Sequence, residues 1–341
     1  MDKQTSTHAS SEATKGGSVD LKDRIRGVIL GAACANSLGG SCVNLNHKDI
    51  LASAGAAVRD FVPGLSRSAF PDHKPGAWLS DTFLAVVLAQ SLIENKGKYV
   101  ESDLKERLKR LLEDTEFLGA GPGAYCLALI RRAVDGIKPQ EDVPEALHVS
   151  GAARAIVVGC LPNSGNTQNI EEIAVAQARL TQADCRVHSA AAVLADSVHF
   201  FLMGKKLDTE AEVRGYVHRH FSLAEKIDSR FAESWDDVAP DLDYANPATE
   251  LPYSLVNIGS DVGELVPTAV GIFLIFRHSL EEAICAAAVA GGDTDTLALI
   301  VGALSGAYHG AGAIPERWLS KIDKRNQLEE VAEGFIALWS H

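Results

Sequence analysis

The sequence predicts an all-α protein folded as a single compact globular domain of about a dozen helices. Its apolar residues fall into segments of about 10 to 18 residues with helical spacing, separated by short polar or glycine-containing turns. The alternation of apolar and polar residues between hairpin turns that is typical of strands does not occur. The sequence has no internal repeat and no obvious linker, so we expect one domain over residues 20–341.

The first expected helices have recognisable ends. Asp20 is a suitable N-cap for a helix over residues 21–40. A loop rich in Gly, Pro and Ser follows over about 61–77. Ser80 and Asp81 are then expected to cap a helix whose apolar residues cover most of its circumference, so this helix should be buried.

The remaining segments continue the helical pattern. Residues 99–117 are strongly amphipathic, residues 118–125 form a turn, and residues 234–250 read as a long polar loop. Further helices are expected over 126–137, 151–161, 170–180, 188–205, 209–227, 268–278, 280–290 and 294–310.

The charge of the chain limits its partners. Its 341 residues include 45 Asp and Glu against 32 Lys and Arg, a formal net charge of −13. Such a surface repels phosphate backbones and anionic lipids, which argues against nucleic-acid and membrane partners. We expect high solubility, with self-association as a property of concentrated solutions.

The cysteines and the N-terminus bear on the compartment. The six cysteines form no CxxC pair and mostly lie in apolar segments, which is typical of reduced thiols in a cytoplasmic protein. Residues 1–19 are polar and lack an apolar signal segment, so we expect a disordered tail there.

The stretch GGDTDT, residues 291–296, separates two segments of small apolar residues. The two glycines are expected to end one helix and Asp293 to cap the next, with Asp295 and Thr296 in its first turn. These three oxygen-bearing side chains also suit Mg²⁺ or Ca²⁺, although an ordinary N-cap beside one carboxylate is the alternative. Glycines at 302, 306 and 310 favour a metal site, because they give this helix a thin face that packs closely in the core.

GGDTDTLALIVGALSGAYHG closely resembles the C-terminal signature of the ADP-ribosylglycohydrolase family. RIRGVILGAACANSLGG, WLSDTFLAVVLAQSL and GSDVGELVPTAVGIFL resemble further family segments, so the resemblance covers most of the chain. It implies an all-α fold with a metal site between helix ends in a cleft. It also implies that the signature's aspartates and threonine bind a pair of Mg²⁺ ions, which orient the ribose and activate water for release of ADP-ribose from an acceptor.

The same resemblance predicts an incomplete site. Where the family carries threonine and two aspartates, this chain has Leu79, Ser80 and Asp81. Asn36 replaces an aspartate and Val43 replaces a glutamate. The ligands that remain are Asp81, Asp293, Asp295 and Thr296. Three carboxylates suffice for one Mg²⁺ or a vestigial site, but not for two ions.

Other residues offer no substitute chemistry. Lone helical histidines are usually packed or surface groups, and solvated loop acids or isolated thiols rarely act as catalysts. The residues concerned are His188, His218, His220, His309, Asp236, Asp237, Cys126, Cys160 and Cys285.

We therefore expect little or no catalysis, no required cofactor and room for at most one Mg²⁺. Within the family the chain is most similar to the J1-crystallin branch of box-jellyfish lenses, so the main interpretation is a structural eye-lens crystallin in the cytosol of lens cells. Two alternatives stay open. One is a Mg²⁺-dependent hydrolase of ADP-ribosylated substrates, and the other is a protein that binds ADP-ribose or a nucleotide without cleaving it.

Overall fold

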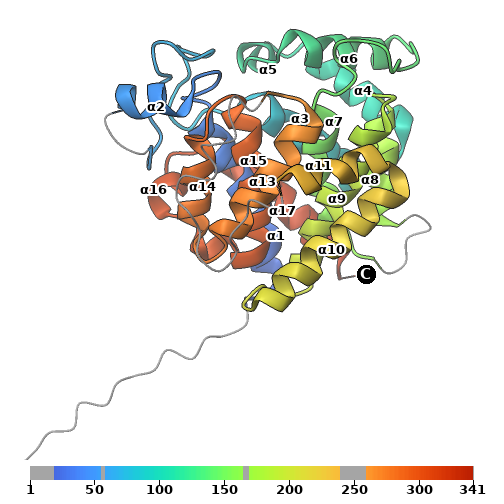
Figure 1. Ribbon diagram of the computed structural model, residues 1–341. Helices are drawn as coiled ribbons and strands as arrows, with labels where there is room; N and C mark the ends of the chain where they lie inside the picture. Colours follow the sequence, from blue (N-terminus) through green and yellow to red (C-terminus); the bar gives the residue numbers. More distant parts are fainter. Residues whose placement is uncertain (1–18, 55–57, 164–168, 239–258, 341) are drawn as a thin grey trace, which may run out of the picture.

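Two helices from opposite ends of the chain, α1 (Leu21–Gly39) and α15 (Thr294–His309), pack against each other at the centre of the fold (Figure 1). Glycines make this close approach possible. A Cβ atom on Gly306 would lie 1.9 Å from the carbonyl oxygen of Gly27, and one on Gly302 would lie 2.4 Å from that of Gly31. The thin face predicted for the glycine series is thus confirmed at Gly302 and Gly306.

The computed structural model describes residues 19–54, 58–163, 169–238 and 259–340. Within these ranges the chain forms sixteen α-helices and two 3-10 helices. Besides α1 and α15, the α-helices are α2 (His47–Ala54), α3 (Ser80–Glu94), α4 (Glu101–Leu111), α5 (Thr115–Gly119), α6 (Ala124–Val134), α7 (Ser150–Ala153), α8 (Ile170–Arg179), α9 (Cys185–Leu202), α10 (Glu210–Ile227), α11 (Ser229–Val238), α13 (Val262–Ile275), α14 (Leu280–Ala288), α16 (Glu316–Leu319) and α17 (Arg325–Leu338). The 3-10 helices are η1 (Arg154–Cys160) and η3 (Ala311–Ala313).

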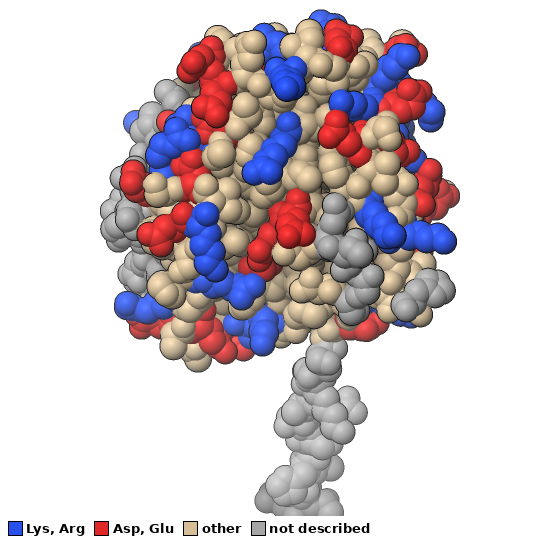
Figure 2. All heavy atoms as spheres, turned by 90° about the vertical axis from the view of Figure 1, so that its right-hand side faces the viewer, with Lys and Arg blue, Asp and Glu red and all other residues tan. Residues whose placement is uncertain are grey.

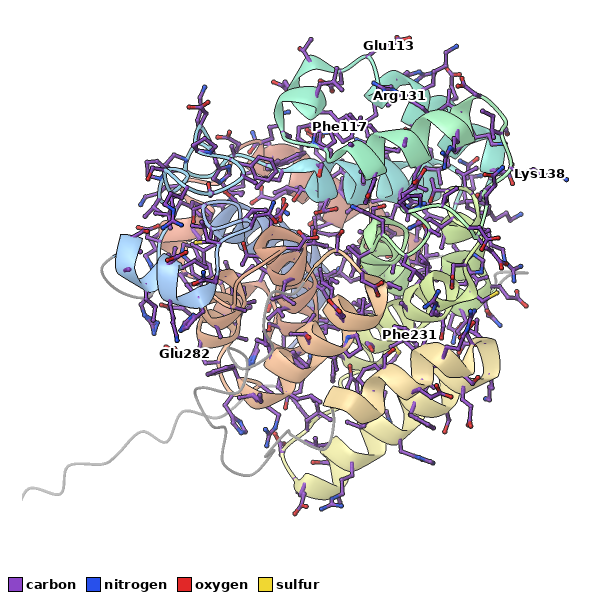
Figure 3. All side chains as sticks on the ribbon, turned by 45° about the horizontal axis from the view of Figure 1, so that its top comes forward. Glu113, Phe117, Arg131, Lys138, Phe231 and Glu282 are labelled. Atoms are coloured by element: carbon purple, nitrogen blue, oxygen red, sulfur yellow. The ribbon has the colours of Figure 1, made fainter. Side chains whose placement is uncertain are left out.

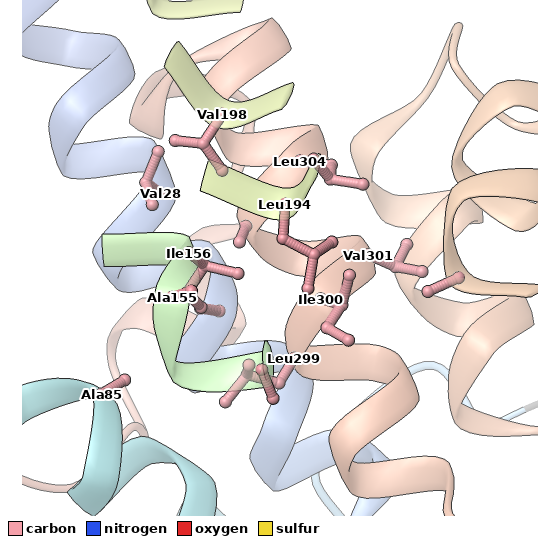
Figure 4. Close-up of a cluster of buried hydrophobic side chains, with 14 of the residues drawn as sticks. Val28, Ala85, Ala155, Ile156, Leu194, Val198, Leu299, Ile300, Val301 and Leu304 are labelled. Atoms are coloured by element: carbon pink, nitrogen blue, oxygen red, sulfur yellow. The ribbon is translucent and has the colours of Figure 1, made fainter. Parts of the chain in front are cut away.

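One continuous apolar core holds these helices together. Figure 4 shows its middle, where Val28 of α1, Ile156 of η1, Leu194 of α9 and Leu299 of α15 meet. All four side chains are fully buried. Because helices from every part of the sequence contribute to it, the prediction of one all-α domain is confirmed.

Several boundaries differ from the predictions. More helices form than the expected dozen because short ones, such as α2, α5 and α16, form in addition to the long helical segments. The predicted helix over 151–161 divides into α7 and η1. The predicted loop over 234–250 starts inside α11, and its residues from 239 onward lie outside the described ranges, as does most of the predicted tail. Leu79, rather than Ser80, is the N-cap residue of α3, and no side-chain cap bond forms there.

The surface carries charges of both signs, and the cysteines form no disulfide. Figure 2 shows acidic and basic side chains intermixed on one face. All six cysteines are free thiols. Among the described residues, no helix combines the length and the apolar character that crossing a bilayer requires.

Candidate functional site

Asp293, Asp295 and Thr296 lie at the start of α15, as predicted. Gly291 and Gly292 have φ angles of +99° and +78°, so the chain can turn sharply between α14 and α15. The predicted capping bond of Asp293 does not form. Its Oδ1 instead accepts a hydrogen bond from the Thr296 hydroxyl at 3.0 Å. Asp293, Asp295, Thr296 and Asp81, described next, are called the cluster.

Helix α3 brings Asp81 to the same hydroxyl. The Oδ2 atom of Asp81 lies 2.8 Å from Oγ1 of Thr296. A hydroxyl has one hydrogen, so Thr296 can donate to only one of its two carboxylate neighbours at a time. The other contact needs a proton or a cation between the oxygens. The structure thus unites all four predicted ligands, Asp81 from α3 with the three at the start of α15.

Burial and mutual repulsion make this cluster hard to ionise. Burial, and after it the charge of Asp293, raises the pKa of Asp81 from 3.8 to about 7, although the Thr296 hydroxyl partly offsets this. Burial also raises the pKa of Asp295 well above its usual value, with added repulsion from Asp293 and Asp81. Among the described residues, Oδ1 of Asp295 meets no hydrogen-bond donor. An unpaired buried carboxylate oxygen costs about 1–3 kcal/mol or more.

These features fit a hard divalent cation. Carboxylate and hydroxyl oxygens are the ligands that Mg²⁺ prefers, and an ion would provide a partner for Asp295 and for the doubly shared Thr296. In the ranges that the structure describes, no group of three or more His, Cys, Asp and Glu side chains is arranged to hold a metal by itself. Hydroxyls, water and substrate oxygens would therefore have to complete the coordination of an ion bound here.

The cluster lines a cavity of about 190 Å³, here called the reaction cavity. It is lined by Val43, Asn44, Ala69, Phe70, Ser80, Asp81, Gly121, Gly123, Cys126, His148, Gly259, Ser260, Asp293, Asp295 and Thr296. Backbone bonds fix its walls. Asn44 N donates to Gly292 O at 2.7 Å, and Val149 N donates to Ser260 O at 2.8 Å.

Several of these lining residues are not among the predicted site residues. The sequence predicts only a turn at Gly121 and Gly123, although a glycine-rich segment also lets a ligand approach the backbone closely. His148 carries no signal in the sequence that predicts a place in the site. Its Nδ1 accepts a hydrogen bond from Ser150 N at 3.2 Å, so the neutral ring carries its hydrogen on Nε2. Burial lowers its pKa, which favours this neutral form.

The positions predicted as lost ligands have different surroundings. Ser80 and Val43 line the reaction cavity, to which they contribute a hydroxyl-bearing and an apolar side chain. Leu79 lines a neighbouring cavity instead and lies over Gly40. Asn36 is completely buried. Its Oδ1 accepts from Leu79 N at 3.1 Å and from the Thr82 hydroxyl at 2.8 Å.

Of the residues to which the sequence assigns no chemistry, Cys126 lines the reaction cavity and the others lie outside its lining. His188, His220 and His309 have ring nitrogens beside backbone carbonyl oxygens, and His218 is exposed. Burial raises the pKa of the Cys126 and Cys285 thiols to about 12, so neither is a thiolate at neutral pH. Asp236 and Asp237 belong to α11, which corrects their placement in a loop.

Comparison with known proteins shows which family model the chain matches. Residues 17–341 match the family model described as ADP-ribosylglycohydrolase. An uncharacterised protein of Archaeoglobus fulgidus is 28% identical, and the match covers 93% of this chain and 97% of that protein. ADP-ribosylhydrolase ARH3 of Bos taurus is 25% identical, over 91% of this chain and 92% of the relative. The ADP-ribosyl-[dinitrogen reductase] glycohydrolase of Rhodospirillum rubrum is 24% identical, over 93% and 97%.

The fold agrees with a solved structure. The ADP-ribosylglycohydrolase-related protein complex superposes with a TM-score of 0.71 at 22% identity, covering 94% of this chain and 99% of that one. At this identity the likeness establishes the all-α architecture alone.

Proposed function

Because this chain belongs to the ADP-ribosylglycohydrolase family, we propose that it releases ADP-ribose from a modified acceptor in the reaction cavity, with one bound Mg²⁺. The observation that carries this proposal is the unpaired Oδ1 of buried Asp295 beside two further carboxylates that share one hydroxyl. A purely structural protein would gain stability by replacing these acids. Their presence favours a site that is completed by a cation and a substrate.

Each side chain has a distinct part in the proposed reaction. Asp81, Asp293 and Asp295 would hold the cation with the Thr296 hydroxyl, and the cation would polarise the ribose oxygens and lower the pKa of a water molecule. The neutral His148 ring presents an N–H donor at the cavity wall, which suits a substrate oxygen. The positive-φ turn at Gly121 lines the same cavity and packs against the Phe70 ring, so both would contact the substrate.

The replaced ligands set the expected rate. Val43 supplies no donor atom, and Ser80 supplies no charge, so a second ion would lack ligands. We therefore expect slower turnover than in a two-ion site. Val43 also favours the second candidate, binding of ADP-ribose without cleavage, since it stands where the family resemblance places a glutamate.

The lens-crystallin interpretation finds no support among the matched relatives, whose names are those of hydrolases or of uncharacterised proteins. Self-association at high concentration stays a prediction, and so does residence in the cytoplasm, which the six free thiols favour.

Release of ADP-ribose tests the proposal. We expect Mg²⁺-dependent release from peptides ADP-ribosylated through oxygen or nitrogen, measured by chromatography and abolished by EDTA. Asp295→Asn should lower kcat/KM roughly 10³-fold, because the cation loses a charged ligand. Asp142→Asn, the same change at an exposed position, should have no effect. Binding of ADP-ribose without release would establish the non-cleaving alternative, and absence of both would overturn the proposal.

A further inference from the structure

A second, larger cavity adjoins the reaction cavity. Its volume is about 470 Å³, and we call it the aromatic pocket. It is lined by Ala69, Phe70, Pro71, Asp72, His73, Lys74, Ala77, Trp78, Leu79, Phe83, Glu116, Gly119, Ala120, Asp323 and Lys324. Ala69 and Phe70 line both cavities. The Phe70 ring packs on Gly121, where a Cβ atom would lie 2.3 Å from its Cε1. A ligand that leaves the reaction cavity over Phe70 therefore enters the aromatic pocket.

A lysine of the chain itself, Lys324, already lies against two aromatic rings of this pocket. The Nζ atom of Lys324 lies 4.8 Å from the ring centroid of Phe83 and 5.2 Å from that of Trp78. It also forms an ion pair with Glu116. Both ring distances are within the range in which aromatic faces attract cations. The pocket can thus hold an ammonium group between two rings and a carboxylate.

The backbone holds Lys324 there in an unfavourable conformation. Its φ of +53° lies in the left-handed region, which costs a non-glycine residue free energy. Neighbouring bonds impose this turn: Trp78 Nε1 donates to Asp323 O at 2.7 Å, and Asp323 N donates to Gly76 O at 2.9 Å. The Trp78 ring and the lysine are therefore positioned by the same contact.

The surroundings suit a basic peptide. Among the lining side chains, the carboxylates of Asp72, Glu116 and Asp323 outnumber the ammonium groups of Lys74 and Lys324. The segment between α5 and α6 contributes to both cavities, and the helices on either side of it expose large apolar side chains. Leu118 of α5 is 42% exposed and Tyr125 of α6 is 47% exposed. Exposed apolar residues beside a cavity are typical of a surface that contacts another polypeptide.

We propose that the aromatic pocket binds a cationic side chain, Lys or Arg, of the ADP-ribosylated acceptor polypeptide, at a position near the modified residue. This deepens the proposed function and rests on it. On binding, the cationic group of the substrate lies between the rings of Trp78 and Phe83 and forms an ion pair with Glu116. The ammonium group of Lys324 is displaced into solvent. No bond is made or broken in this step. An acidic peptide would instead face three carboxylates against two ammonium groups.

Matched peptides test this inference. Two ADP-ribosylated peptides would differ only in having lysine or its uncharged analogue norleucine beside the modified residue. For the wild-type protein with Mg²⁺, we expect kcat/KM to be about 3- to 10-fold higher for the lysine peptide. Lys324→Met removes the internal competitor and should raise this ratio further. Glu116→Gln should bring it close to one. Glu113→Gln, the same change just before α5 and outside the pocket (Figure 3), should leave it unchanged.

Failure of this inference can be told from failure of the proposed function. If a small ADP-ribosyl adduct without a peptide is hydrolysed but the lysine and norleucine peptides react equally, the pocket does not read a cation and the inference is overturned. An unchanged ratio in Lys324→Met would overturn the displacement of the internal lysine. If nothing is hydrolysed, the hydrolase proposal fails, and the dissociation constants of the uncleaved peptides give the same ratio by calorimetry.

Discussion

Two groups beside the reaction cavity satisfy their polar atoms to different degrees. The α15 wall, made of Asp293, Asp295 and Thr296, leaves one buried carboxylate oxygen without a donor among the described residues. Behind the start of α3, by contrast, the side-chain oxygen of Asn36 in α1 accepts two hydrogen bonds. Asn36 there joins three backbone segments, since its amide also donates to Asp295 O at 3.3 Å.

This difference separates a ligand-binding role from a structural one. An unpaired buried oxygen is costly for an isolated protein, whereas an amide with every partner in place stabilises the fold. Asn36 thus holds α1 to α3 through hydrogen bonds and brings no charge to the site. We expect changes in the α15 wall to affect ligands, and changes at Asn36 to affect stability.

The largest effect is expected for Asn36→Leu. Leucine is close to asparagine in volume but accepts no hydrogen bond, so the Leu79 amide and the Thr82 hydroxyl lose their buried acceptor. Each such loss costs about 1–3 kcal/mol, and we expect the free energy of unfolding to fall by about 3 kcal/mol. Denaturant titration followed by circular dichroism measures this change.

Asn326→Leu, at an exposed position of α17, is the matched control and should be nearly neutral. If Asn36→Leu proved equally mild, Asn36 would not join the helices as described. A stable variant without Mg²⁺ binding would instead place Asn36 among the groups that bind the ligand.

The second test restores charge to the eroded wall. Ser80 lines the reaction cavity, so Ser80→Asp would add a carboxylate facing the cluster and should raise Mg²⁺ affinity about tenfold, as calorimetry would measure. Leu79→Asp is the comparison, because Leu79 lines the aromatic pocket and should not contact the ion. Equal gains from both variants, or a gain from neither, would contradict this placement of the start of α3.

Sequence alone gave the helical fold and the four-residue cluster, for identifiable physical reasons. Helical periodicity and the glycine series at 302 and 306 are local patterns, and the GGDTDT stretch resembles a specific family signature. What sequence could not give were contacts between distant segments. The role of Asn36 depends on where Leu79 and Thr82 lie. The position of Lys324 depends on a turn that is hydrogen-bonded to the Trp78 side chain. Short helices such as α5 were missed because a single turn has no periodicity.

The smallest expected effect is a pH dependence of Mg²⁺ binding that comes from Asp81. Its pKa is raised to about 7 by burial and by Asp293, so in the absence of an ion the folded state holds this proton more tightly than the unfolded state does. The sign follows from linkage: without Mg²⁺, this group makes stability fall as pH rises from about 4 to 7, and Mg²⁺ must displace the proton below pH 7.

Affinity should therefore fall about fourfold between pH 8 and pH 6.5, since about nine-tenths of Asp81 is ionised at the first pH and about a quarter at the second. Calorimetry in two buffers of different ionisation enthalpy would measure both the affinity and the proton release. Asp81→Asn should bind the ion more weakly at either pH and show a flatter profile. If the Mg²⁺ affinity of Asp81→Asn depended on pH as steeply as that of the wild type, the titrating group would be Asp295 on the α15 wall.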